Sequence, residues 1–144
     1  MPAIWNVIRT EHGEVNELFT QFSTADTTQQ QSIFNNIKQA LTAHAELEEE
    51  LVYPLLRDMD NEMAQHAQEE HAEVKMLLSE LSALEIGGEE FMRKMERLQT
   101  AVNEHVTEEE DEVLPMMEGA VEDSEAQQIG SEWARQKKEL IAAG

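Results

Sequence analysis

Hydrophobic side chains recur at helical spacing along four long segments of the chain. In each segment an apolar residue returns every three or four positions, which is the period of an amphipathic α-helix. The segments span about residues 3–22, 26–57, 61–84 and 89–118. They are rich in residues that favour helices, and only 3 Pro and 6 Gly interrupt the whole chain. Since no run keeps the period of two that marks a strand, the pattern predicts an all-α fold.

Short polar breaks separate these segments, near residues 23–26, 58–61 and 87–88. Asp26 and Asp60 stand where a carboxylate can cap the first free N–H groups of the following helix. Because short connections join antiparallel neighbours, we expect an up-down-up-down four-helix bundle.

A fifth, shorter segment follows at about residues 122–142, with Ile129, Trp133 and Leu140 on one face. This face can pack on the bundle or on a partner. The length suits one domain, so we expect residues 1–144 to form a single domain, with the bundle over about residues 3–118 and a C-terminal helical extension.

Each of the four core stripes carries a histidine near its middle. These histidines are His12, His44, His71 and His105. Two of them are followed four residues later by a glutamate, Glu48 and Glu109, and four residues turn a helix by about 400°, so each glutamate shares the core face of its histidine. A buried carboxylate without a partner is costly, so these groups need a common partner.

The two halves of the chain repeat this arrangement. Residues 11–18 align with residues 70–77, and residues 44–49 align with residues 105–110. A proline follows ten residues after the histidine in each half, at Pro54 and Pro115. An approximate two-fold axis would therefore bring four histidines and two glutamates together as two equivalent triads. Two triads suit two metal ions, with the carboxylates placed to bridge them and an oxide or hydroxide bridge neutralising further charge.

Composition narrows the chemistry of such a site. The chain has 31 Asp plus Glu against 10 Lys plus Arg, a net charge of −21, which disfavours nucleic acid and anionic membranes as partners. It has no cysteine, so a metal would rest on histidine and carboxylate, ligands that suit iron, manganese or zinc. The Glu-x-x-His, His-Glu-x-x-His and EF-hand patterns of other metal proteins are absent. No secretory signal or transmembrane stretch stands out, so we expect a cytoplasmic protein.

The ordered set of His12, His44-x-x-x-Glu48, His71 and His105-x-x-x-Glu109 resembles the haemerythrin-like (haemerythrin HHE cation-binding) family. The resemblance covers about residues 4–117. It implies a non-haem di-iron centre inside a four-helix bundle, with the four histidines as terminal ligands and the two glutamates as bridges.

The sequence departs from the oxygen-carrying haemerythrins at Ala67, where they have a second histidine four residues before that of the third helix. One iron is therefore short of a ligand. Glu70 and Tyr53 are weak candidates to fill this gap, because Glu70 is turned about 100° from His71 and Tyr53 lies nominally on the opposite face of its helix. We expect a surface position for His66 and for several further glutamates, namely Glu49, Glu50, Glu108, Glu110 and Glu112.

These features favour a di-iron protein that binds O₂ or a related small oxidant, as a binding or sensing protein. A peroxide-decomposing or nitric-oxide-handling enzyme at the same centre is the first alternative, so the sequence leaves open whether the chain is an enzyme. Iron sequestration or sensing without catalysis is the second. The expected partner is a small molecule, O₂, peroxide or nitric oxide, and the sequence indicates no particular protein partner.

Overall fold

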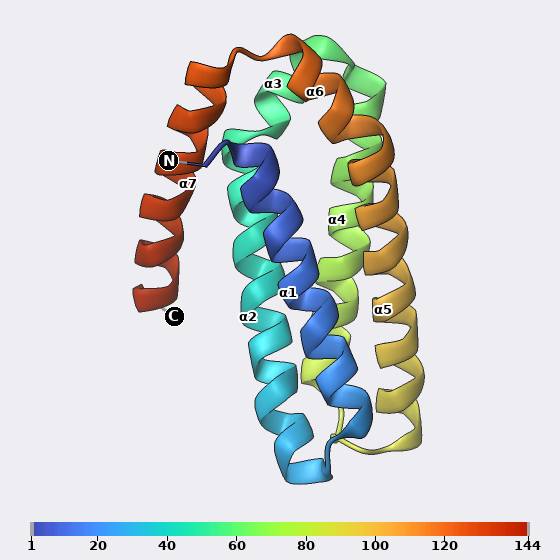
Figure 1. Cartoon of the computed structure of the whole chain (residues 1–144). Coiled ribbons are helices and arrows are strands. Elements are labelled where there is room, and N and C mark those ends of the chain that lie inside the picture. The colour runs from blue at the N-terminus through green and yellow to red at the C-terminus, as the bar shows by residue number, and fades with distance from the viewer. Residues whose placement is uncertain (1, 144) are drawn as a thin grey trace.

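Helices make up nearly all of the computed structural model, which describes residues 2–143 (Figure 1). No strand occurs within those residues, so the predicted all-α class is confirmed. The helices are α1 (Ile4–Thr24), α2 (Thr27–Leu51), α3 (Tyr53–Met59), α4 (Asn61–Ser82), α5 (Glu89–Glu108), the π-helix η1 (Glu109–Val113), α6 (Leu114–Ala120) and α7 (Asp123–Ala143).

The four long helices α1, α2, α4 and α5 lie side by side. Helix α1 packs on α2, α2 on α4, and α4 on α5. The turn from α1 to α2 and the loop from α4 to α5 lie at one end of the molecule, and α3 and α6 lie at the other (Figure 1). The aspartate caps are present: Asp26 forms a capping box with Gln29, and Asp60 accepts a hydrogen bond from the Met63 N–H.

Two segments that the sequence pattern predicts as single helices, at about residues 26–57 and 89–118, are interrupted. Helix α2 ends at Leu51, and α3 begins after a turn at Val52, with Pro54 in its first turn. In the second half a π-helix occupies Glu109–Val113 before Pro115. Proline lacks the N–H that a helix needs and crowds the preceding turn, so both breaks fall just before the prolines of the repeat.

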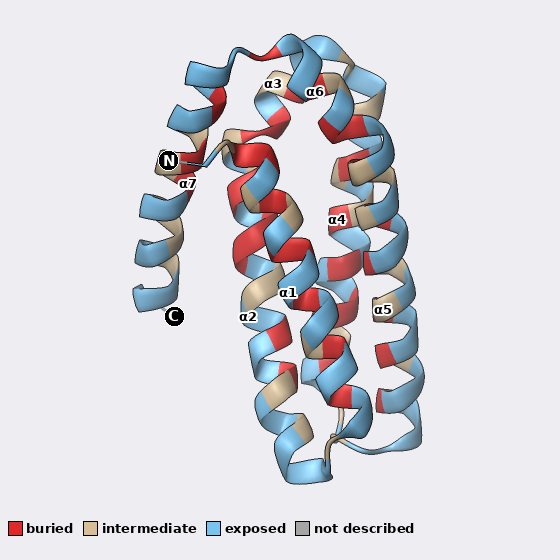
Figure 2. Cartoon of the chain, viewed as in Figure 1, coloured by how far each residue is buried: buried red, intermediate tan, exposed pale blue. Residues whose placement is uncertain are grey.

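Buried positions lie on the inward faces of the helices (Figure 2). The apolar core consists of two clusters. One includes Ile8, Ala67 and Val113, near α3 and α6; the other includes Val15 and Val102, towards the α1–α2 turn. The first cluster comprises Ile4, Trp5, Ile8, Leu47, Val52, Tyr53, Leu56, Ala64, Ala67, Val113, Leu114, Met117, Val121, Ala126 and Trp133. Along the chain, each of His12, His44, His71 and His105 lies between a residue of one cluster and a residue of the other, so a polar layer divides the core.

Helix α7 packs on α1 and α2 of the same chain. Trp133 is its fully buried anchor. Gly130 allows a close approach to the N-terminal segment, since a Cβ there would lie 2.4 Å from the carbonyl oxygen of Pro2. Across residues 2–143, no helix is long and apolar enough to cross a membrane.

Candidate metal centre

All six residues singled out by the stripes converge in the polar layer. Their side chains are buried, and Glu48 and Glu109 are 0% and 1% exposed. They form two groups whose ligand atoms lie within 4.8 Å of one another. One triad is His12, His44 and Glu109, and the other is Glu48, His71 and His105.

Glu48 and Glu109 each complete a triad with two histidines of other helices. Each also contacts the histidine four residues before it in the sequence. The Oε1 of Glu109 lies 3.1 Å from His12 Nε2, and its Oε2 lies 3.3 Å from His105 Nε2. The Oε1 of Glu48 lies 3.1 Å from His71 Nε2 and 3.2 Å from His44 Nε2. Both carboxylates therefore contact imidazoles of both triads.

Several of these atoms are buried without a hydrogen-bond partner. They are the Nε2 atoms of His12 and His44, both carboxylate oxygens of Glu48, and Oε1 of Glu109. The Nε2 atoms approach the carboxylates at about ion-pair distance but without hydrogen-bond geometry. A neutral imidazole with its proton on Nδ1 presents an Nε2 lone pair, and a carboxylate also presents lone pairs, so a cation between them satisfies both. The donor set therefore fits a metal.

Four further glutamates hold the outer nitrogens of the four rings. Each histidine Nδ1 donates to a carboxylate on a different helix, at 2.7–2.9 Å. The pairs are His44 with Glu11, His71 with Glu49, His105 with Glu70, and His12 with Glu110. They form a closed cycle: α1 holds the histidine of α2, α2 that of α4, α4 that of α5, and η1, which continues α5, that of α1. Such partners fix the tautomer and orientation of a metal-binding imidazole, leaving Nε2 free to bind.

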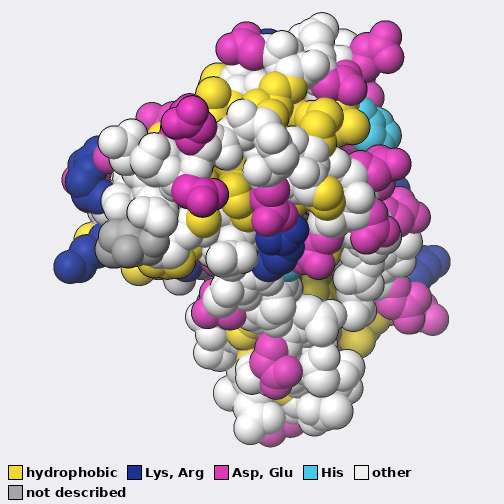
Figure 3. Space-filling view, turned by 45° about the horizontal axis from the view of Figure 1, so that its top comes forward, with side chains coloured by type: hydrophobic (Ala, Val, Ile, Leu, Met, Phe, Trp, Pro, Cys, Tyr) yellow, Lys and Arg dark blue, Asp and Glu magenta, His cyan; other side chains and the backbone are white. Residues whose placement is uncertain are grey.

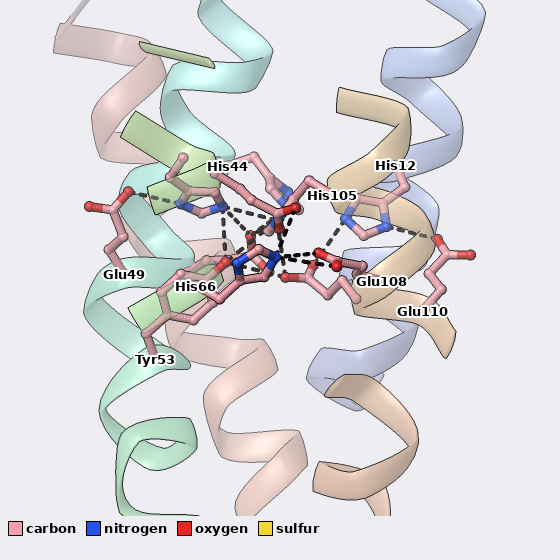
Figure 4. A network of polar contacts seen from close by, with 12 residues as sticks. His12, His44, Glu49, Tyr53, His66, His105, Glu108 and Glu110 are labelled. Atoms are coloured by element: carbon pink, nitrogen blue, oxygen red, sulfur yellow. Dashed lines mark hydrogen bonds and ion pairs between the residues drawn. The ribbon is translucent and has the colours of Figure 1, made fainter. Parts of the chain in front are cut away.

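This cycle corrects several sequence expectations. Glu49 and Glu110 were expected on the solvated surface, but they are only partly exposed and approach the network from opposite sides (Figure 4). Glu70 does not fill the gap at Ala67, because it hydrogen-bonds His105 Nδ1 from outside the triad. His66 is exposed as expected, and it contacts Glu70 and Glu108 in a separate surface group.

Tyr53 also differs from the expectation that it faces away. It is fully buried, and its hydroxyl lies 3.0 Å from His71 Nε2 and 3.5 Å from His105 Nε2. The hydroxyl also donates to Glu109 Oε2 at 3.3 Å. The turn at Val52 breaks the helical phase after His44, which brings the ring to the His71–His105 triad. The signal for this was Pro54, because a proline there can end the helix and cancel a face assignment.

Electrostatics among the side chains of the site favour charged pairs. Burial alone would lower the pKa of His44, but the charge of Glu48 and the hydrogen bond to Glu11 raise it to about 10. Burial would raise the pKa of Glu48, yet His44 and the other imidazoles hold it well below the usual value. Burial, with Glu48 and Glu109 nearby, raises the pKa of Tyr53, so its hydroxyl keeps its proton. A metal ion would displace the second proton of each imidazole, and the carboxylates that attract that proton would attract the ion as well.

A small cavity of about 30 Å³ borders the imidazoles. Five ionisable and six aliphatic side chains line it. The residues are Glu11, His12, Val15, Leu41, His44, Ala45, His71, Val74, Val102, His105 and Val106. Val15, Val74 and Val102 belong to the core cluster on the opposite side of the polar layer from Tyr53.

Fold and site together define a helical protein with a buried His/carboxylate cation site. The family model described as "Hemerythrin HHE cation binding domain" matches residues 3–117. The chain therefore belongs to the haemerythrin HHE cation-binding family, and metal binding is a property of that domain. Its α7 lies beyond the matched residues.

Relatives place this domain in different proteins. The chain is 32% identical over 139 residues to a protein named DNA nickase from Nostoc sp., and 28% identical over 102 residues to an uncharacterized hemerythrin-like protein of Schizosaccharomyces pombe. These matches cover 95% and 68% of this chain, but only 40% and 50% of the relatives. A crystal structure of a hemerythrin HHE cation binding domain-containing protein from Mycobacterium kansasii has the same fold, with a TM-score of 0.87, 23% identity, and coverage of 99% of this chain and 90% of that one.

Proposed function

We propose that this chain is a di-iron protein that binds O₂ or a related small oxidant. The four long helices form an antiparallel up-down-up-down bundle around the centre. Each triad would hold one ion, and Glu48 and Glu109, which contact histidines of both triads, would join the two. The cavity beside the imidazoles is the observation that carries the proposal, because it offers a small apolar ligand a place next to the centre.

Imidazole and carboxylate are ligands that suit iron, and family membership supports the same choice. Iron held there supplies a redox centre that exchanges electrons with a small oxidant. The chain itself supplies the geometry. The Glu11, Glu49, Glu70 and Glu110 carboxylates orient the four rings so that every Nε2 points inward.

The cavity limits what can reach the centre. A cavity of about 30 Å³ exceeds the ~10–15 Å³ that one water needs, so it suits a diatomic or similarly small molecule. Valine and leucine side chains form its far wall, and such a wall favours an uncharged guest over water.

Peroxide decomposition is the second candidate, and Tyr53 favours it. The phenol keeps its proton and lies at hydrogen-bond distance from His71 and Glu109. It can therefore donate a hydrogen bond or a proton to an oxygen species beside the His71–His105 triad. A purely binding protein has less use for a proton donor at that position.

We further propose that small molecules, and not nucleic acids, are the partners of this chain. One relative is named DNA nickase, but this chain spans only 40% of that protein. Here 31 acidic residues face 10 basic ones, and the face drawn in Figure 3 shows acidic side chains spread widely among few basic ones. Phosphate backbones reward clustered positive charge.

Filling the cavity tests the proposal. Val102→Ile adds one methylene to the wall, and an oxidant that must displace it meets an overpacking cost of about 1–3 kcal/mol, or about 5- to 150-fold in rate. Val121→Ile is the matched control, because Val121 lies in the other core cluster. Both variants are loaded with Fe(II) without air and mixed with O₂ or peroxide in a stopped-flow spectrometer.

We expect Val102→Ile to keep its iron and to react more slowly, while Val121→Ile reacts like the wild type. A reversible visible band with O₂ supports binding, and steady O₂ release from peroxide supports the enzyme. Iron uptake with no reaction with either oxidant would contradict both and leave sequestration. An unchanged rate in Val102→Ile would show that the cavity is not where the oxidant binds.

A further inference from the structure

The C-terminal helix α7 reaches the metal centre through two side chains. The indole N–H of Trp133 donates to Glu11 Oε2 at 2.9 Å, and the Lys137 ammonium donates to the same oxygen at 2.9 Å. The other oxygen, Glu11 Oε1, accepts from His44 Nδ1 at 2.9 Å. The Trp133 ring also lies edge-on to the His44 ring, with centroids 5.3 Å apart.

The indole and the carboxylate that make these contacts are shielded from solvent. Trp133 is fully buried, and Glu11 is 8% exposed. A buried carboxylate needs its hydrogen bonds satisfied, so both oxygens of Glu11 have defined partners and the carboxylate has one orientation. That orientation fixes the plane of the His44 ring.

The other three carboxylates of the cycle are held differently. Glu49 accepts hydrogen bonds from Gln68 and Lys75 of α4. Glu70 contacts His66, which lies on the same helix as Glu70, α4. For Glu110, the described residues offer no partner beyond His12. In the described part of the chain, only Glu11 is held by α7, a helix that carries none of the six candidate ligands.

We propose that Trp133 and Lys137 are positioning residues that clamp α7 onto the metal centre and fix His44 for the ion in the His12–His44–Glu109 triad. These contacts make the two triads unequal, because they link Trp133 and Lys137 through Glu11 to His44 in one triad only. One is braced by α7, and the other lies beside Tyr53. The clamp rests on the proposed function, because it acts on an ion held in the first triad.

Groups that hydrogen-bond the outer nitrogen of a metal-bound histidine change metal affinity by about 10- to 100-fold. Trp133 and Lys137 act one contact further out, so we expect the lower end of that range. The effect should fall on one ion of the two, because neither side chain contacts His71 or His105 among the described interactions.

Trp133→Phe and Lys137→Met test the clamp in the full-length protein. Phenylalanine keeps an aromatic ring near His44 and removes the N–H, while methionine keeps an aliphatic stem and removes the ammonium. Trp5→Phe is the matched control for the first, because Trp5 is a buried tryptophan in the same apolar cluster. Lys138→Met, at the exposed neighbouring position, is the control for the second.

Each protein is loaded with Fe(II) without air, and iron release to a coloured chelator is followed with time. We expect one of two iron equivalents to leave about tenfold faster in Trp133→Phe and Lys137→Met, and the other to leave at the wild-type rate. Circular dichroism of the metal-free proteins checks folding. Lys137→Met alters a partly exposed side chain, so it keeps the test open if Trp133→Phe does not fold.

The outcomes separate the clamp from the proposed function. A wild type that takes up no iron overturns the proposed function. A wild type with two ions, together with variants that release both at wild-type rates, overturns the clamp alone. Equal acceleration of both ions, or the same change in Trp5→Phe and Lys138→Met, would also overturn the clamp, because it would show general loosening of the fold.

Discussion

Metal loading should stabilise the fold in two steps, because each triad has a pair of histidines of its own, His12 with His44 and His71 with His105. Six buried ligand residues meet in the core, and several of their polar atoms have no hydrogen-bond partner. The unfolded chain cannot assemble either triad. An ion that binds only the folded state therefore adds its binding free energy to the free energy of unfolding.

The size of each step follows from mass action. Free metal at one hundred times its Kd contributes about 2.7 kcal/mol per site, or about 5.4 kcal/mol for two sites. For a chain of this length, one kcal/mol moves Tm by about 2–5 °C. We therefore expect full loading to raise Tm by about 10–25 °C.

His12→Gln should give about half of that rise. His12 belongs to one triad, so its loss weakens one ion and leaves the Glu48–His71–His105 triad complete. His66→Gln is the control, because His66 is an exposed histidine outside both triads. Thermal unfolding is followed by circular dichroism with and without Fe(II), in the absence of air. Loss of the whole rise in His12→Gln would refute two separable sites, and no rise in the wild type would refute metal binding.

Three further changes test other parts of the structure. Tyr53→Phe removes one buried hydroxyl, so unfolding measurements should show a loss of about 0.5–1.5 kcal/mol, with iron content kept and peroxide turnover reduced; unchanged turnover would exclude Tyr53 as a proton donor. The pKa of His44 is raised from 6.5 to about 10 in the folded metal-free protein, so its contribution to stability should be complete below pH 6.5 and disappear as the pH rises through 10; denaturant unfolding across that range measures it, and a flat profile would contradict it. Gly130→Ala would place a Cβ 2.4 Å from the Pro2 carbonyl oxygen, so we expect a loss of about 1–3 kcal/mol in thermal unfolding, and no loss would mean that the N-terminal segment moves freely.

The inward faces of the helices could be predicted from the sequence because, within an unbroken helix, residues three or four positions apart lie on the same face. His12, His44, His71 and His105 stand between apolar residues of their own stripes, and Glu48 and Glu109 follow at a spacing that preserves the face. The structure brings these six side chains together. Helical period alone could not show which glutamate joins which histidines, because that depends on how the helices are placed around one another.

Tyr53 was only a weak candidate, and the roles of the outer carboxylates were missed, for two physical reasons. The turn at Val52 resets the helical phase, so a face counted from His44 fails at Tyr53. Glu11 and Glu70 immediately precede a histidine but hold the histidine of the next helix, a contact that no spacing within one helix reveals. The repeated Glu-His and Glu-Glu pairs were the available signal, since each pair contains one inward group and one neighbour turned by about 100° towards the adjacent helix.

The number of iron ions that the six residues hold is the most direct test of the proposed centre. Elemental analysis of Fe(II)-loaded protein, taken with visible spectra before and after exposure to air, measures it. We predict two irons per chain in the wild type and fewer than two in the folded Glu48→Ala, Glu109→Ala double variant, with the air-dependent spectral change lost. Two irons retained in that variant would contradict the assignment of Glu48 and Glu109 as bridges, and a wild type without iron would contradict the centre itself.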